Sequence, residues 1–432
     1  MKTSLFVSTS LALALSTSAV ADNNFVIQNQ IGAGNSATAD NSSGSVDNSL
    51  IVQTQVGFNN SMTASQNNVV SNSIINQTQI GTNNNMNAEQ MDGPSSTIIN
   101  QTQIGTNNSS ESSDLNNSTS VKTTIQIGDG NTAESDQGTT SSSSIEVYQL
   151  GTTNNANAQQ VITDSTTQFT LQFGDQNTAS NYQENTNGVS SIINQIGTTN
   201  TADVVQFISS DSTAELSQAG PSNSARIDQI DSSSASGFIA QVGNTNYAKI
   251  SQLDANSDTV QILQSGTQNS AETTQTISNS NNLLIIQVGT QNSTSPNQSL
   301  SENSSATILQ TGFGNSVDTA DQNTLLGSLF SIQLGSGNSA NMNQLGVDVN
   351  LSVIQVGSDN STNSQQDGVL LRATIAQTGS SNVADITQSG LGNSLTLLQI
   401  GNGHYKEISQ TGVNQSSFTT QIGSANFASV QQ

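Results

Sequence analysis

Side-chain amides recur along this chain at a spacing that can form hydrogen-bonded ladders. A motif of the form Q-x-G-x-x-N-x-A-x-x-x-Q occurs in 18 copies, which follow one another every 22–25 residues. A carboxamide has two N–H donors and one oxygen acceptor, so stacked copies of one Gln or Asn can bond amide to amide. The leading Gln of the motif is a predicted ladder residue and stands at Gln30, Gln55, Gln79, Gln103, Gln126, Gln149, Gln172, Gln195, Gln218, Gln241, Gln264, Gln287, Gln310, Gln333, Gln355, Gln377, Gln399 and Gln421.

A Gly and an Asn follow each leading Gln at fixed distances and predict a tight turn. The Gly is present in all 18 copies and the Asn in 17, with His404 as the exception. Gly takes positive φ at little cost, and Asn tolerates the left-handed region. The predicted turn residues are Gly32, Gly57, Gly81, Gly105, Gly128, Gly151, Gly174, Gly197, Gly220, Gly243, Gly266, Gly289, Gly312, Gly335, Gly357, Gly379, Gly401 and Gly423. The Asn positions are further expected ladder residues, among them Asn200, Asn246, Asn292, Asn338 and Asn426. The closing Gln of the motif is present in 15 copies, and the other three copies have Asn41, Asp114 and Asp321 in its place.

Two strands must position these residues in each repeat. Apolar residues alternate with other residues before the leading Gln, as Ile145 and Val147 do before Gln149, and alternation resumes after Asn200. Period-two alternation indicates strands. A single pair of strands cannot bury one face, whereas stacked copies can. We therefore expect an all-β fold, a β-solenoid or cross-β stack of 18 strand-turn-strand repeats, with strands of successive repeats about 4.7–4.9 Å apart.

The charge of the chain argues against nucleic acid as a partner. Six Lys and Arg stand against 30 Asp and Glu, which gives a formal charge of −24. Binding a polyanion needs clustered cations, whereas dispersed acids keep monomers apart. Acids avoid the leading Gln, Gly, Asn and Ala positions of the motif and fall at expected turns or outward sites, such as Asp129 and Glu272. Lys122 falls at an inward site and Lys406 replaces the Ala of the motif, so we expect these two rungs to be locally distorted or weaker.

Other kinds of chemistry find little support in the sequence. The chain has one His, no Cys, no Gly-rich phosphate loop and no repeated pair of acids, so we expect neither an enzyme nor a cofactor. Turn acids do not recur at one position from copy to copy, so no metal site is expected. A flat face that binds ice or mineral would need a regular outward array, yet the outward positions vary, as in Thr201 with Asp203 and Tyr247 with Lys249.

The first residues have the form of a secretory leader. Lys2 precedes an apolar stretch from Leu5 to Leu15, and Ala19-Val20-Ala21 is a cleavage site with small residues at its first and third positions. The apolar stretch is shorter than the roughly 20 residues that a membrane-spanning helix needs. We predict a signal peptide at residues 1–21 and one repeat solenoid at residues 22–432, without separate caps, in an exported protein.

The expected ends of the stack suggest a polymer. The first repeat begins near Asn24, and the closing Gln of the last repeat is Gln432. A terminal rung without a cap presents unpaired backbone groups that can pair with another chain. End-to-end association of copies into a fibre is the leading hypothesis. A non-polymerising secreted β-solenoid adhesin or stalk, whose ends another protein caps, is the alternative.

The repeat resembles that of a known family. The segment Gln195–Ala202, Q-I-G-T-T-N-T-A, closes at Gln206 and resembles the curlin repeat of curli fibre subunits, and the resemblance extends over residues 24–432. It implies a bacterial functional amyloid in an extracellular, cell-surface fibre that supports biofilm matrix and surface adhesion. It also implies export through the periplasm and an outer-membrane secretion channel with its chaperones, and polymerisation with a nucleating minor curlin subunit.

Overall fold

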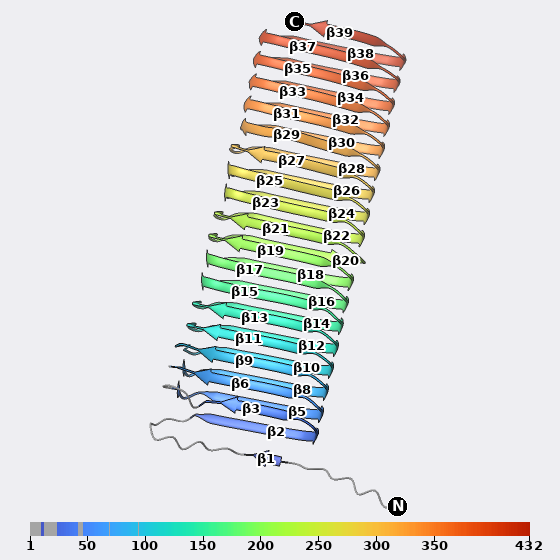
Figure 1. Ribbon diagram of the computed structural model, residues 1–432. Helices are drawn as coiled ribbons and strands as arrows, with labels where there is room; N and C mark the ends of the chain where they lie inside the picture. Colours follow the sequence, from blue (N-terminus) through green and yellow to red (C-terminus); the bar gives the residue numbers. More distant parts are fainter. Residues whose placement is uncertain (1–9, 13–23, 42–45, 69, 94) are drawn as a thin grey trace, which may run out of the picture. The chain divides into compact units, whose positions relative to one another are not determined.

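The computed structural model describes residues 10–12, 24–41, 46–68, 70–93 and 95–432, and this part of the chain is built from β-strands without a helix. It divides into two compact units, Met1–Asp211 and Ser212–Gln432, which are described separately. In each unit, a first strand, a tight turn, a second strand and a second turn make one rung, and rungs stack in parallel (Figure 1). The predicted all-β solenoid of strand-turn-strand repeats is therefore confirmed.

In the unit Met1–Asp211, the first strands of the rungs are β2 (Phe25–Ala33), β5 (Leu50–Phe58), β8 (Ile74–Thr82), β10 (Ile98–Thr106), β12 (Val121–Asp129), β14 (Ser144–Thr152), β16 (Thr167–Asp175) and β18 (Ser190–Thr198). The second strands are β3 (Ser36–Asp40), β6 (Ser61–Asn67), β9 (Asn85–Met91), β11 (Ser109–Leu115), β13 (Thr132–Gly138), β15 (Asn155–Asp164), β17 (Thr178–Asn187) and β19 (Thr201–Phe207). Short strands β4 (Val46–Asp47) and β7 (Val70–Ser71) pair in parallel at the second turns.

In the unit Ser212–Gln432, the first strands are β20 (Thr213–Ala219), β22 (Ser236–Asn244), β24 (Thr259–Thr267), β26 (Asn282–Thr290), β28 (Ser305–Phe313), β30 (Ser328–Ser336), β32 (Asn350–Ser358), β34 (Arg372–Ser380), β36 (Ser394–Asn402) and β38 (Ser416–Ser424). The second strands are β21 (Ser224–Ile230), β23 (Tyr247–Asn256), β25 (Ser270–Asn279), β27 (Ser293–Ser299), β29 (Ser316–Leu325), β31 (Ser339–Val347), β33 (Ser361–Val369), β35 (Val383–Leu391), β37 (Tyr405–Val413) and β39 (Phe427–Gln431).

Within each unit, strands of successive rungs pair in the register of the motif. In the first unit Gln79 pairs with Gln103, and in the second Gln264 pairs with Gln287. Because the register keeps equivalent residues level, each inward position becomes a column of like side chains along the stack. The ladders of the site therefore follow directly from the strand register.

The core lies between the two sheets of each unit. Three alternating residues of each strand point inward, as Ile75 and Gln77 with Gln79 do on β8, and Met86 and Ala88 do on the facing strand β9. The apolar residues that the sequence placed inward, including Ile145 and Val147, are fully buried. The alternation therefore sorts aliphatic side chains and amides into one narrow interior.

The local distortion expected at Lys122 and Lys406 is absent from the strand register, whereas a weaker rung stays a prediction. Strand β12 keeps full register with β10 and β14 through Lys122, and β37 keeps its register with β35 and β39 through Lys406. The backbone is not distorted at Lys122 because an acid in the same interior compensates its charge, as described below. At Lys406 the level neighbours are Ala384 and Ala428, whose small side chains leave space.

The closing position of one repeat was also assigned wrongly. The register between β29 and β31 shifts between Asp318 and Asp321, so that Gln322, and not Asp321, is level with Gln344. A β-bulge accommodates an extra residue in one strand, and here it brings Gln322 level with Gln344 where the repeat length changes.

The predicted signal peptide, residues 1–21, lies outside the described residues except for strand β1 (Ser10–Ala12). This strand runs antiparallel to β2, with Ser10 level with Gln30 and Ala12 level with Gln28. No helix in the described part of the chain is long and apolar enough to cross a membrane.

Candidate functional site

The leading Gln side chains form a continuous ladder in each unit. In the first unit Gln30 Nε2 donates to Gln55 Oε1 at 2.9 Å, and the series continues in the same sense to Gln172, which donates to Gln195 at 2.9 Å. In the second unit the series runs from Gln218, which donates to Gln241 at 2.9 Å, to Gln399, which donates to Gln421 at 2.8 Å. All 18 predicted Gln residues therefore belong to one of two ladders, and only Gln30, on the first rung, is half-buried.

Leading Gln residues of the interior rungs also link the two sheets. The second N–H of Gln79 goes to the carbonyl oxygen of Ser61 on the facing sheet at 2.9 Å, and that of Gln264 goes to Tyr247 at 2.8 Å. A buried amide that leaves a donor unpaired costs about 1–3 kcal/mol, so both N–H groups need a partner. The ladder thus fastens rung to rung and sheet to sheet with one side chain.

The Asn residues of the first turn form a second ladder, which also holds the backbone. Asn246 Nδ2 donates to Asn223 Oδ1 at 3.1 Å, and the backbone N–H of Asn246 donates to the same oxygen at 3.1 Å. Asn246 Nδ2 also donates to Gly266 O of the following rung at 3.0 Å. The predicted residues Asn200, Asn292 and Asn338 make the same amide contact to the Asn one rung earlier.

Asn426 does not belong to this ladder. It is exposed, and its Nδ2 donates to Ile422 O of its own rung at 2.9 Å. The rung before it carries His404, whose Nδ1 accepts the backbone N–H of Asn426 at 3.3 Å. His404 Nε2 lies 3.1 Å from Ile400 O, so the neutral tautomer with its proton on Nε2 fits both contacts. The imidazole continues the backbone bond of the Asn ladder but cannot supply its amide oxygen.

The turn glycines are required by a close approach between rungs. All 18 have φ between +106° and +132°, outside the region that other residues favour. A Cβ added to Gly266 would lie 1.9 Å from Gly289 O, which is the oxygen that the Asn ladder uses on that rung. Gly423 differs, because a Cβ there would meet nothing within 4 Å. The steric demand for Gly is therefore present wherever a further rung follows.

A third ladder, at the second turn, was not predicted. Where the residue six before the leading Gln has an acceptor side chain, that side chain accepts the backbone N–H of its equivalent one rung later at several rungs, and the series is interrupted where the residue is Val, Ala, Gly or Leu. Ser304 N donates to Asn281 Oδ1 at 2.8 Å, and Asn281 N donates to Asp258 Oδ1 at 2.7 Å. Burial raises the pKa of Asp258, while its bonds from Ser278 and Asn281 oppose that rise. A short acceptor side chain, Ser, Thr, Asn or Asp, recurs at this position, and this shared class is the signal that could have found the ladder.

Two successive rungs carry a buried ion pair in place of an amide and an aliphatic side chain. Lys122 on β12 and Asp114 on β11 meet with Nζ and Oδ1 2.7 Å apart, and both side chains are 1% exposed. Burial lowers the pKa of Lys122, while the charge of Asp114 opposes this effect. Lys122 also donates to the carbonyl oxygens of Ser113 and Ser135. In the second unit Lys406 is buried without an ion pair to it in the described structure, and burial lowers its pKa.

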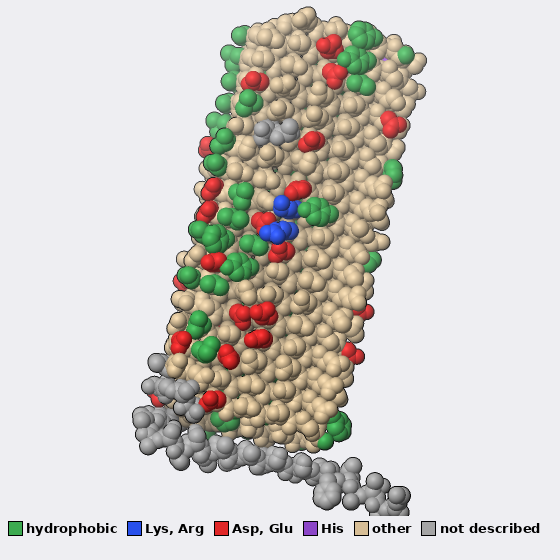
Figure 2. All heavy atoms as spheres, viewed as in Figure 1, with side chains coloured by type: hydrophobic (Ala, Val, Ile, Leu, Met, Phe, Trp, Pro, Cys, Tyr) green, Lys and Arg blue, Asp and Glu red, His purple; other side chains and the backbone are tan. Residues whose placement is uncertain are grey.

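The two outer faces differ in chemistry. Figure 2 looks onto the face of the odd-numbered strands, where carboxylates are scattered over a polar surface and cationic side chains lie among them. Lys249 and Glu272 form an exposed ion pair there at 3.1 Å, and Arg226 pairs with the mostly buried Asp228 at 2.8 Å. On the same face of the first unit, burial and the neighbouring Asp136 raise the pKa of Glu134. Among the described residues, no group of three His, Asp or Glu side chains could hold a metal ion.

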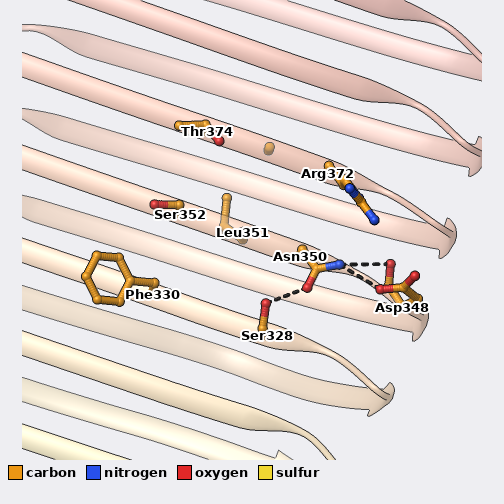
Figure 3. Close-up of a pocket in the computed structure, with 9 residues that line it drawn as sticks. Ser328, Phe330, Asp348, Asn350, Leu351, Ser352, Arg372 and Thr374 are labelled. Carbon is orange, nitrogen blue, oxygen red and sulfur yellow. Dashed lines mark hydrogen bonds between the residues drawn. The ribbon is translucent and has the colours of Figure 1, made fainter.

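A shallow open hollow of about 480 Å³ lies on the even-numbered strands of the second unit (Figure 3). Phe330 and Arg372 border it, and Asp348 is the only acid among its lining residues. Asn350 donates to Asp348 Oδ1 at 2.8 Å and accepts from Ser328, so its amide is already engaged. The hollow therefore offers a ring and a guanidinium, but no acid and base that could work together on a substrate.

Comparison with known proteins identifies the repeat. The family model described as the curlin associated repeat matches residues 357–390 and 371–401, which span the end of β32 to the end of β36. A comparison with curated proteins gave no match. The matched rungs contain the ladder residues Gln377 and Gln399 and the turn residue Gly379, in the same register as the other rungs. Residues 357–401 are therefore similar to the curlin associated repeat.

Proposed function

We propose that this chain is the structural subunit of an extracellular, curli-like amyloid fibre that grows by pairing of the last rung of one copy with the first rung of the next. The curlin repeat and the β-solenoid fold fit a structural or adhesin role. The proposal includes secretion, a role in biofilm matrix and surface adhesion, and the partners that the resemblance implies: a nucleating minor subunit and an outer-membrane channel with its chaperones.

The observation that carries the proposal is the free side of the last rung. Strand β38 pairs with β36 and β39 pairs with β37, and in the described structure neither has a strand on its other side. Gln421 accepts from Gln399 and, like interior Gln residues, donates to the facing sheet at Tyr405 O. Its other N–H goes to Asn426 O, whereas interior rungs donate to the next Gln. A parallel strand in register would complete this ladder.

The first rung offers the complementary groups. Gln30 donates to Gln55, so a Gln of a preceding rung could donate to its oxygen. Aligning Gln421 with Gln30 also brings Gly423 level with Gly32. Strand β1 pairs with this edge of β2, and cleavage after Ala21, as predicted, would remove it. Export and assembly would then be coupled, since the acceptor edge would be exposed only in the mature chain.

Gly423 gives the experiment its specific variant. Its Cβ would meet nothing in the isolated chain, whereas the same Cβ on Gly401 would lie 1.7 Å from Gly423 O. Gly423→Ala should therefore fold, with some strain confined to the last turn, but should collide with Gly32 O of an incoming copy. Ser429→Ala, at an outward site of the same rung, is the matched control.

The assay is elongation of wild-type seeds by mature protein from Asp22, followed by thioflavin T fluorescence and electron microscopy. We expect wild type and Ser429→Ala to elongate seeds and Gly423→Ala to elongate them at least tenfold more slowly, with an unchanged circular dichroism spectrum. Equal elongation by Gly423→Ala would refute pairing through this rung. Wild-type protein that stays a folded monomer with seeds would favour the solenoid adhesin or stalk.

A further inference from the structure

The outer face of the even-numbered strands β22 to β38 differs from every other surface of its unit in lacking acids. These nine strands contain no Asp or Glu, and Arg372, at the margin, is their only cation. The odd-numbered strands of the same unit carry Glu272, Asp318, Asp385 and Glu407 at outward positions. From β22 onward, the acids of this unit therefore lie on the odd-numbered strands and in the turns.

Apolar side chains cover the centre of the acid-free face. Two outward columns flank the leading Gln column: Leu263, Ile286 and Ile332 stand in one, and Val242 and Ile400 in the other. Val242 is 55% exposed and Ile400 39%. Contiguous exposed apolar surface of this extent marks an interaction site on a soluble protein.

The size of this face suits a specific interface. Nine strands spaced by about 4.8 Å, and five residues of about 3.3 Å along each strand, give roughly 700 Å² per copy. Two such faces in contact would bury about 1,400 Å², within the range of stable specific interfaces. The area therefore suffices for a partner that covers the face along its whole length.

We propose that this face pairs with the same face of a second copy, so that two solenoids associate laterally, sheet against sheet. Two copies have columns of the same pitch, so their side chains can interdigitate over the full length, whereas a partner without this period would match only locally. Approach through any other surface would bring carboxylates of two acidic chains together. Sheets packed face to face lie about 10 Å apart, which these aliphatic side chains can fill.

A hollow in the face supports interdigitation. It measures about 180 Å³ and lies where Ser265 interrupts the column between Val242 and Val288. Leu263 and Ile286 complete its apolar wall. Such a hollow can receive an aliphatic or aromatic side chain of the opposing sheet, as knobs do between packed sheets.

The test uses charge on the face and a matched set of charges on the opposite face. Ile286→Glu, Ile332→Glu and Leu398→Glu, combined in the full mature chain, place carboxylates on the proposed interface on strands that are not direct neighbours. Thr274→Glu, Asn343→Glu and Thr387→Glu add the same charge to outward sites of the odd-numbered strands. Circular dichroism verifies that both variants keep the β-sheet spectrum of wild type.

Mass per length of fibres, measured by scanning transmission electron microscopy, reports lateral pairing. One rung of 23 residues weighs about 2.4 kDa from the mass of the chain, so one stack has about 0.5 kDa/Å and a pair about 1.0 kDa/Å. We expect about 1.0 kDa/Å for wild type and the control and about 0.5 kDa/Å for the interface variant. A wild-type value of about 0.5 kDa/Å, or an interface variant that stays paired, would overturn the proposal.

Lateral pairing does not rest on fibre growth, and the outcomes separate the two. If no fibres form, sedimentation equilibrium of folded protein replaces the fibre measurement. A wild-type dimer that the interface charges dissociate supports pairing even though end-to-end growth has failed. A wild-type monomer overturns it, and a monomer that floats with phosphatidylcholine vesicles assigns the face to a lipid surface instead.

Discussion

The buried pair Lys122 and Asp114 allows the energetics of the interior to be tested by substitution. On the strands next to β12, Ile99 and Ile145 are level with Lys122, and on the strands next to β11, Gln90 and Gln137 are level with Asp114. The combination of Lys122→Ile with Asp114→Gln would therefore give each of the two positions the side chain of its level neighbours. The two substitutions replace an ion pair by one more aliphatic rung and one more amide rung.

The magnitudes follow from the environment of the pair. Both side chains are 1% exposed, and Asp114 Oδ2 has no hydrogen-bond partner in the described structure, so the desolvation of the carboxylate is only partly compensated. Replacing such a pair by well-packed residues of similar volume commonly stabilises by about 1–4 kcal/mol. Lys122→Ile alone leaves a buried carboxylate without its cation and should destabilise by about 3–5 kcal/mol. Two new amide bonds, to Gln90 and Gln137, would contribute about 1 kcal/mol each.

A double-mutant cycle by urea denaturation, with circular dichroism as the signal, measures these differences at pH 7. We expect the double variant to be the most stable, wild type to be intermediate and Lys122→Ile to be the least stable. The coupling free energy between the two sites should be at least about 3 kcal/mol. A Lys122→Ile variant as stable as wild type, or a double variant less stable than either single variant, would refute the argument. Either result would mean that the pair is solvated or that the interior does not accept the neighbouring side chains at this rung.

Four further substitutions probe the ladders and the turns. Asp258→Asn keeps an acceptor for the backbone N–H of Asn281. Because the pKa of Asp258 is raised in the folded state, wild-type protein loses stability as the pH rises above the unfolded pKa and through the folded pKa. The variant should therefore have a higher urea midpoint than wild type at pH 7 and an equal urea midpoint at pH 3. Gly266→Ala should lower the free energy of unfolding by roughly 3 kcal/mol or more, because its Cβ would meet Gly289 O. Gly314→Ala, with open space around its Cβ and a φ of +64°, should lower it by about 1 kcal/mol. Similar thermal midpoints for the two variants would contradict the close-approach argument. His404→Asn would extend the Asn ladder and should slow hydrogen exchange of the amide of Asn426 about fivefold, the equivalent of about 1 kcal/mol; unchanged exchange would show that the imidazole serves equally well.

Much of the fold could be predicted because the fixed spacing of the repeat defines which residues of successive rungs are level with each other. A Gln and a Gly at fixed spacing indicate both the inward column and the turn, and period-two alternation around them defines two strands. In the structure Gln264 and Gln287 are level and bonded, at 2.8 Å. Such columns are accessible from sequence because they depend only on residues one repeat apart.

Contacts across a rung were harder to predict. Asp114 and Lys122 each depart from the motif, but their contact depends on the second turn, which brings the closing position of one repeat opposite an inward site of the next. The bulge in β29 has a similar cause, because spacing alone cannot show in which of the two strands an extra residue is absorbed. The second-turn ladder was missed for another reason: Ser, Thr, Asn and Asp share an acceptor role there without sharing an identity.

End-to-end assembly is the central claim, and seeded polymerisation of the wild-type mature chain tests it most directly. Protein diluted from denaturant would be followed by thioflavin T with and without preformed seeds, and the product examined by electron microscopy and fibre diffraction. Pairing of open rungs predicts fibres, a lag that seeds abolish, and a reflection at about 4.7–4.8 Å along the fibre axis. A soluble, folded monomer that persists for days at high concentration with seeds present would contradict it.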